Sequence, residues 1–189
     1  MEKDIKIMLG AFPTELESDI ESIFTLVKLK TELYTNSIFE VSVDGNTLII
    51  PERIYYQNLD ENELACLSTT QQQILDCFFT RHHNGYVRQE KLNRIFARGK
   101  IDTWVIPYLI KLLGEYIVEI IGDIYKNIDL IDEVGLKNFI KSNQSFILTT
   151  EGRIASYWGE YYQRDYKKEE YVGFKIKKHI QSLRKQLVY

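Results

Sequence analysis

The sequence predicts a mainly α fold with a minor β part: a helical bundle around a central buried helix at 104–126, a β-hairpin near 38–50 and a short strand near 145–149. The predicted central helix is apolar on nearly every side, which is typical of a helix inside a core. Hydrophobic residues make up 44% of the 189-residue chain, enough to surround it. Prolines and glycines are few, so we expect 1–189 to form a single domain, with 152–189 as a basic, aromatic-rich helical segment.

The first third of the chain predicts one long helix and the hairpin. Residues 14–33 carry an apolar face at helical spacing, and Thr14 and Glu17 are placed for a capping box at its start. In the hairpin, apolar and polar residues alternate before an Asp-Gly-Asn turn, and an apolar strand follows it. A short acidic helix is expected at 60–66.

The remainder of the chain predicts further helices. Ser68 and Gln71 form a second candidate capping box, which starts a helix at 69–82, and Asp132 is placed to cap another. The other expected helices lie at 88–97, 133–142, 150–164 and 168–187.

Four ionisable residues interrupt the apolar central helix: Lys111, Glu115, Glu119 and Asp123. They recur every fourth residue, so a single helix would place them in one polar stripe. Each would cost about 2.5–3.5 kcal/mol near the centre of a bilayer, which excludes a membrane span. We interpret the stripe as solvated or paired with arginine, rather than as a row of catalytic carboxylates.

Charge and cysteine content restrict the class of protein. Residues 1–67 hold 13 acidic and 5 basic residues, whereas residues 152–189 hold 4 acidic and 9 basic ones. The two cysteines suggest neither a disulfide framework nor a thiolate metal site. The N-terminal stretch lacks the long apolar region of a signal peptide, and we expect a cytoplasmic protein.

Motifs for catalysis and for cofactor binding are missing from the sequence. It contains no phosphate-binding loop, no dinucleotide fingerprint and no nucleophile elbow. The cluster Arg81-His82-His83-Asn84 does not suit a metal, because adjacent histidines on a helix point about 100° apart. We interpret it as the polar end of a helix, expect no metal and no cofactor, and favour a protein that is not an enzyme.

The basic segment at the end of the chain is the predicted interaction surface. Its aromatic residues alternate with cations, a composition found at protein interfaces and also where single-stranded nucleic acid stacks. We expect the apolar face of the last helix to bury itself against the acidic front of the chain or against a second copy. The predicted surface residues are Tyr157, Trp158, Tyr161, Tyr162, Lys175, Lys177, Lys178 and Arg184.

Two partial family resemblances accompany these patterns. Val87, Arg88, Leu92 and Pro107 occupy places typical of one unit of a HEAT-type helical repeat, although a single unit cannot form a solenoid. The segment FILTTEGR at 146–153, after three helices, resembles the end of a winged helix-turn-helix domain. The sequence thus predicts a protein-interaction or self-association domain. The alternative is a nucleic-acid-binding regulator on a winged-helix-like scaffold, and no membrane partner is expected.

Overall fold

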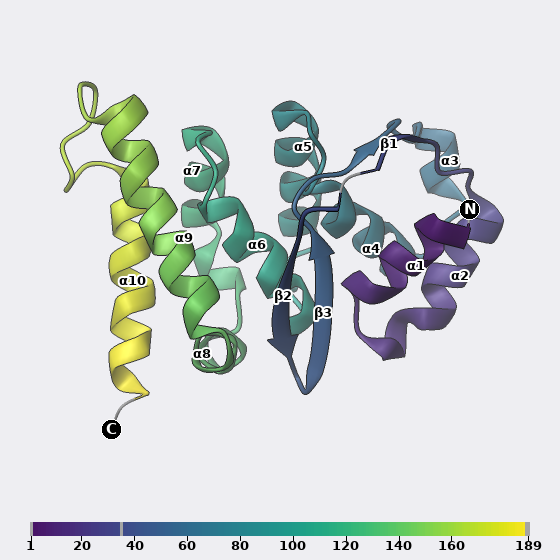
Figure 1. Ribbon diagram of the computed structural model, residues 1–189, viewed down its shortest axis with the longest axis horizontal. Helices are drawn as coiled ribbons and strands as arrows, with labels where there is room; N and C mark the ends of the chain where they lie inside the picture. The colour runs from purple at the N-terminus through teal and green to yellow at the C-terminus, as the bar shows by residue number, and fades with distance from the viewer. Residues whose placement is uncertain (1, 35, 188–189) are drawn as a thin grey trace. The chain divides into compact units, whose positions relative to one another are not determined.

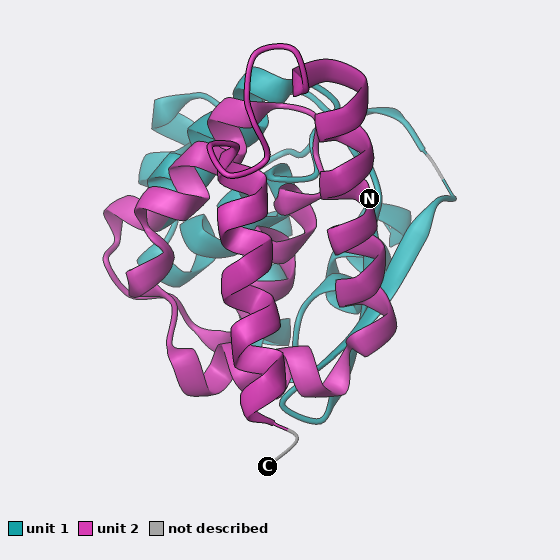
Figure 2. Ribbon diagram, turned by 90° about the vertical axis from the view of Figure 1, so that its left-hand side faces the viewer, with its two compact units in different colours: residues 1–95 teal, residues 96–189 magenta. Residues whose placement is uncertain are grey.

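The computed structural model describes residues 2–34 and 36–187, and the chain divides into two compact units, 1–95 and 96–189 (Figure 2). Helices dominate both units, and the strands described form two small antiparallel pairs (Figure 1). The predicted mainly α fold with a minor β part is therefore confirmed. None of the helices in the described ranges combines the length and the apolar character that crossing a bilayer requires.

The first unit contains more elements than the sequence predicts. Its helices are α1 (Glu2–Ala11), α2 (Glu17–Leu26), α3 (Glu61–Ala65), α4 (Thr69–Phe79) and α5 (Gly85–Ala97), the last of which ends just beyond the unit boundary. Its strands are β1 (Thr31–Leu33), β2 (Ile38–Val43), β3 (Asn46–Pro51) and β4 (Tyr55–Tyr56). Helix α1 and the pairing of β1 with β4 were not predicted from the sequence.

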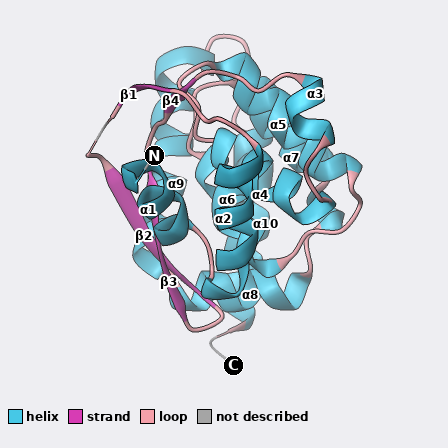
Figure 3. Ribbon diagram, turned by 90° about the vertical axis from the view of Figure 1, so that its right-hand side faces the viewer, coloured by secondary structure: helices cyan, strands magenta, loops and turns pink. Residues whose placement is uncertain are grey.

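The predicted hairpin is formed by β2 and β3, with Val41 opposite Leu48. At its turn, Asp44 and Gly45 both have positive φ angles, 49° and 85°, as a tight two-residue hairpin turn requires. Helix α1 packs against β3, where Gly10 lies close to Ile49 (Figure 3). This packing gives the two-stranded hairpin the support that it would lack alone.

Two of the three predicted helix caps are correct. The capping box of Ser68 and Gln71 starts α4, and Asp132 accepts a hydrogen bond from the backbone N–H of Gly135. The box predicted at Thr14 is wrong, because a 3-10 turn (Thr14–Leu16) precedes α2 there and neither element has a side-chain cap. Helix α2 also ends earlier than predicted, since Val27 adopts an extended backbone conformation.

The second unit is entirely helical in its described part, apart from an isolated β-bridge between Ile101 and Ile131. Helix α6 packs against α7, α8 and α9, and α10 packs against the same three helices. The elements are a 3-10 turn (Thr103–Val105), α6 (Ile106–Leu113), α7 (Val118–Lys126), a 3-10 turn (Ile128–Leu130), α8 (Glu133–Ser142), α9 (Gln144–Tyr157), a π-helix (Trp158–Tyr162) and α10 (Val172–Gln186).

The central element is shorter than predicted, because the run 104–126 is broken into α6 and α7 rather than forming one helix. Gly114 ends α6, and Ile117 is extended. The Tyr162 hydroxyl bridges the break: it donates to the Tyr116 carbonyl at 2.5 Å and accepts from the Val118 N–H at 3.3 Å. This bridge supplies partners for two backbone groups that an unbroken helix would have satisfied internally.

The break also removes the single polar stripe. Lys111 and Glu115 are buried, with 5% and 4% of their surface exposed, whereas Glu119 is exposed and Asp123 is half-buried. All eight residues of α6 are buried, so this short helix is the core element that the apolar run predicts.

The predicted strand at 145–149 is wrong, because these residues lie inside α9. The buried residues of this helix recur at helical spacing: Ile147, Thr150, Glu151 and Ile154. A five-residue window was too short to show this period. The segment 146–153, which carries the winged-helix resemblance, is therefore helical throughout.

Candidate functional site

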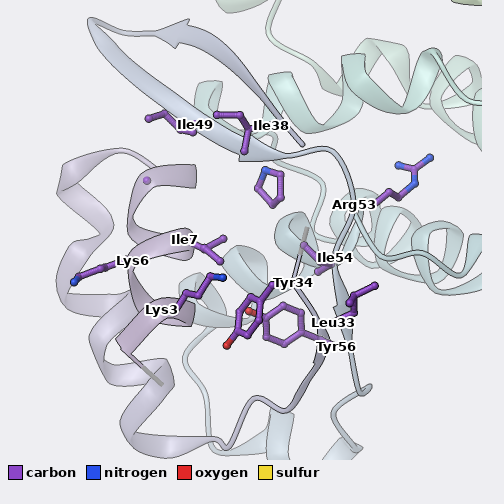
Figure 4. Close-up of a pocket in the computed structure, with 12 residues that line it drawn as sticks. Lys3, Lys6, Ile7, Leu33, Tyr34, Ile38, Ile49, Arg53, Ile54 and Tyr56 are labelled. Atoms are coloured by element: carbon purple, nitrogen blue, oxygen red, sulfur yellow. The ribbon is translucent and has the colours of Figure 1, made fainter. Parts of the chain in front are cut away.

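The first unit contains a groove of about 290 Å³ bounded by α1, β1, the hairpin and the segment that leads into β4 (Figure 4). Its walls are largely aliphatic. The apolar side chains that line it are Ile7, Leu33, Ile38, Ile49, Pro51 and Ile54. We define these residues, together with Lys3, Lys6, Gly10, Tyr34, Arg53 and Tyr56, as the groove.

Apolar side chains are unusually exposed in the groove. Leu33 and Ile38 show 56% and 50% of their surface to solvent, and Tyr34 and Ile49 show 40% and 43%. Single exposed apolar residues are ordinary on a protein surface, whereas these four lie together along one groove. In the hairpin this follows from strand alternation, because Ile38 and Ile49 lie on the face opposite buried Val41 and Leu48.

Three cations lie along the groove in an otherwise acidic half of the chain. Residues 1–67 contain only five basic residues, and Lys3, Lys6 and Arg53 all line this one groove, whereas none of its described lining residues is acidic. Lys3 extends toward Tyr34, with its Nζ 4.0 Å from the ring centroid, while Lys6 and Arg53 point outward (Figure 4). The groove therefore combines an apolar floor with cations along its edge, of which Lys6 is paired with Glu2 of the same helix at 2.7 Å.

A buried carboxylate holds one end of the groove together. Asp4, in the first turn of α1, accepts hydrogen bonds from the hydroxyls of Thr31, Tyr34 and Tyr56, the last at 2.6 Å. Burial acts to raise the pKa of Asp4, but these hydrogen bonds outweigh it and lower the pKa to about 2. The charged carboxylate thus ties α1 to the β1–β4 pair, and Tyr56 in turn packs on Phe78 and Phe79 of α4.

The hydroxyl groups of the groove are engaged by Asp4. The groove's only described hydroxyls belong to Tyr34 and Tyr56, and both donate to Asp4. Burial and the bond to Asp4 raise the pKa of Tyr56, so its phenol stays protonated and cannot serve as a base near neutral pH. Within the described ranges, no three side chains of the metal-ligating kinds His, Cys, Asp and Glu come together.

The aromatic residues predicted as an interaction surface all belong to the second unit, where Tyr161 is exposed and the others are half-buried. Tyr157 and Tyr161 contact the exposed Tyr116, with ring centroids 6.3 Å and 6.1 Å from it. Tyr162, described above, bridges the break between α6 and α7. Trp158 packs edge-on against Phe174 at 5.5 Å. The π-helix carries several of these rings, and such helices occur often at functional sites.

The predicted cations of α10 divide between two surroundings. Arg184 pairs with the buried carboxylate of Glu151 at 3.4 Å, and Lys177 donates to the Glu151 carbonyl at 3.3 Å. Lys175 and Lys178 instead line a hollow beside α7. Arg184 is therefore neutralised by a carboxylate of α9. The apolar face of α10 is covered by α7, α8 and α9 rather than left for the acidic front or a second copy.

The histidine cluster lies in the loop between α4 and α5, where hydrogen bonds hold it in place. The ring of His82 accepts from the Asn84 N–H at Nδ1, so its Nε2–H donates to the Tyr56 carbonyl at 2.8 Å. Burial lowers the pKa of His82, which favours this neutral ring. The Arg88 guanidinium, in the first turn of α5, donates to the carbonyls of His82 and His83 in the loop that follows α4.

The sequence reasoning missed the groove, although one signal for it was present. Alternation in the hairpin directs Ile38 and Ile49 away from the core, which leaves two isoleucines on an outward face. The approach of α1 to this face depends on Asp4 meeting residues 27 to 52 positions further along the chain. The chain matches no known protein family, no curated protein and no solved structure.

Proposed function

We propose that this chain is a non-enzymatic protein-interaction domain, and that the groove binds a short apolar segment of a partner protein flanked by acidic residues. One observation carries the proposal: the groove gathers exposed aliphatic side chains and three of the five cations found in residues 1–67. Burying the aliphatic walls supplies affinity, and the cations at the rim select acidic flanks.

The chemistry of the walls favours a protein segment over nucleic acid at this groove. Isoleucine and leucine side chains pack well against other aliphatic groups, whereas nucleic acid is bound mainly through phosphates and base stacking. A partner residue such as leucine would fill the space between Ile38 and Ile49, and an adjacent carboxylate would reach Lys3 or Arg53.

The cytoplasm is the proposed compartment for this interaction. Cys66 and Cys77 are both free thiols, and free thiols are the rule for proteins kept in a reducing compartment.

The test is a random-peptide display selection on the full chain, followed by calorimetry with the enriched peptides. We expect enrichment of aliphatic residues flanked by Asp or Glu. Ile49→Glu should weaken binding about tenfold or more, because it places a carboxylate inside the apolar groove and beside the acidic flanks. Leu148→Glu is the matched control: Leu148 is also exposed, at 55%, but lies on α9 outside the groove, and its replacement should leave binding unchanged.

Two outcomes would overturn the proposal. Enriched peptides without an acidic bias, or with equal affinity for the Ile49→Glu chain, would show that the groove is not the binding site. The second outcome comes from sedimentation of the chain without peptide. If the chain dimerises and Ile49→Glu abolishes the dimer, the groove is occupied by a second copy of the chain instead of a partner protein.

A further inference from the structure

Helix α10 carries cations but no acidic residue, and these cations lie on two different faces of the helix. Lys177 and Arg184 turn toward Glu151 of α9. Lys175, Lys178, His179 and Ser182, spaced three and four residues apart, share the other face and line the hollow beside α7. The second face therefore presents cations that Glu151 does not engage.

The hollow is a space of about 550 Å³ between α7, the 3-10 turn Ile128–Leu130 and α10. Tyr125 and Ile128 form an apolar wall opposite α10, with Asp129 beside them. The Tyr125 ring is 41% exposed, and the Lys175 Nζ lies 5.8 Å from its centroid. One side of the hollow is thus apolar, and the other side carries side chains that can donate hydrogen bonds.

We propose that this hollow binds a nucleoside phosphate. The planar base would pack on Tyr125 and Ile128, as bases do on aromatic side chains in single-strand binding sites. The phosphate would accept hydrogen bonds from Lys178, His179 and Ser182, donors that suit an anionic oxygen. This site lies entirely in the second unit and does not depend on the function proposed for the groove.

The acidic residue in the hollow narrows the ligand class. Asp129 would accept a hydrogen bond from a base amino group or a sugar hydroxyl, which inorganic phosphate lacks. A second negative charge close to Asp129 would be repelled, so a monophosphate fits better than a polyphosphate. A second carboxylate, that of Glu133, interacts with His179 through its charge. Glu133 is itself paired with Lys137 at 2.5 Å.

Stacking on Tyr125 also requires an accessible base face. Duplex nucleic acid covers its base faces, whereas a free mononucleotide or the end of a single strand exposes one. A free mononucleotide and the end of a single strand present the same recognised groups, a base with its phosphate. The experiment below distinguishes between these two ligands.

The experiment is isothermal calorimetry on the full chain at low salt. The ligands are adenosine monophosphate, uridine monophosphate, adenosine, inorganic phosphate and a 5′-phosphorylated oligothymidylate. We expect saturable binding of a mononucleotide, at least tenfold tighter than that of adenosine or phosphate alone, because each of these lacks one half of the recognised chemistry. Tighter binding of the oligonucleotide than of any mononucleotide would identify a single strand as the source.

Variants show whether the hollow is the site. Lys178→Ala and Tyr125→Leu should each weaken binding about tenfold, and Tyr125→Leu keeps an apolar side chain so that the fold is preserved. Lys185→Ala is the matched control, since Lys185 is an exposed cation of the same helix outside the hollow. No saturable binding of any ligand at millimolar concentration, or equal losses for Lys178→Ala and Lys185→Ala, would refute the proposal.

Discussion

Replacing Asp4 by asparagine should destabilise the first unit and should also remove part of its sensitivity to acid. Asparagine keeps the shape of the side chain and one acceptor oxygen, but it loses the charge on which three hydroxyls converge. The fall in the Asp4 pKa from 3.8 to about 2 corresponds to about 2 kcal/mol of preference for the charged form. Because asparagine retains some of the hydrogen bonding, we expect a loss of about 1–2 kcal/mol in unfolding free energy near neutral pH.

The pH dependence has a definite sign. The pKa of Asp4 is lower in the folded protein than in the unfolded chain, so its contribution is fully present above pH 3.8 and is lost as the pH falls through about 2. The stability difference between wild type and Asp4→Asn should therefore shrink across that window. From neutral pH down to about pH 3.8, this stability difference should stay constant.

The assay must report on the first unit alone. Both tryptophans, Trp104 and Trp158, lie in the second unit, so tryptophan fluorescence would follow the wrong half of the chain. Amide hydrogen exchange over residues 28–57, read by mass spectrometry at several pH values, measures opening of the β1–β4 pair directly. Glu40→Gln, a substitution at an exposed position of β2, is the control and should leave exchange unchanged. Equal protection in wild type and Asp4→Asn at neutral pH would refute the reasoning.

Three further predictions follow from burial and capping. Leu113→Ala should lower the free energy of unfolding by about 2–5 kcal/mol in urea melts followed by tryptophan fluorescence, because Leu113 is fully buried. Ile117→Ala should lower it by less, because Ile117 is half-buried. Equal losses for the two variants would contradict the broken helix. Ser68→Ala should cost about 1 kcal/mol by removing the cap of α4, measured by urea unfolding followed by circular dichroism. Deleting 166–189 should unfold the second unit, because it removes the buried face of α10; a truncated chain with unchanged circular dichroism and melting temperature would contradict this packing.

Elements with local signals were predictable from the sequence. The hairpin follows from an Asp-Gly turn between apolar strands, and the starts of α4 and α8 follow from capping residues that act within three positions. The buried α6 follows from its composition, which is apolar except for Lys111. In each case the residues that decide the structure are neighbours in the chain, so a single sequence contains the whole signal.

Only the tertiary structure decided where the long apolar run breaks and where the proposed binding groove lies. The break at Gly114 is satisfied by the hydroxyl of Tyr162, which lies 46 positions away from Tyr116. The groove exists because Asp4 collects hydroxyls from β1 and β4, and because α1 packs beside the outward face of the hairpin. Contacts of this kind join residues that are distant in sequence, and neither periodicity nor spacing records which distant partner satisfies a given backbone group or carboxylate.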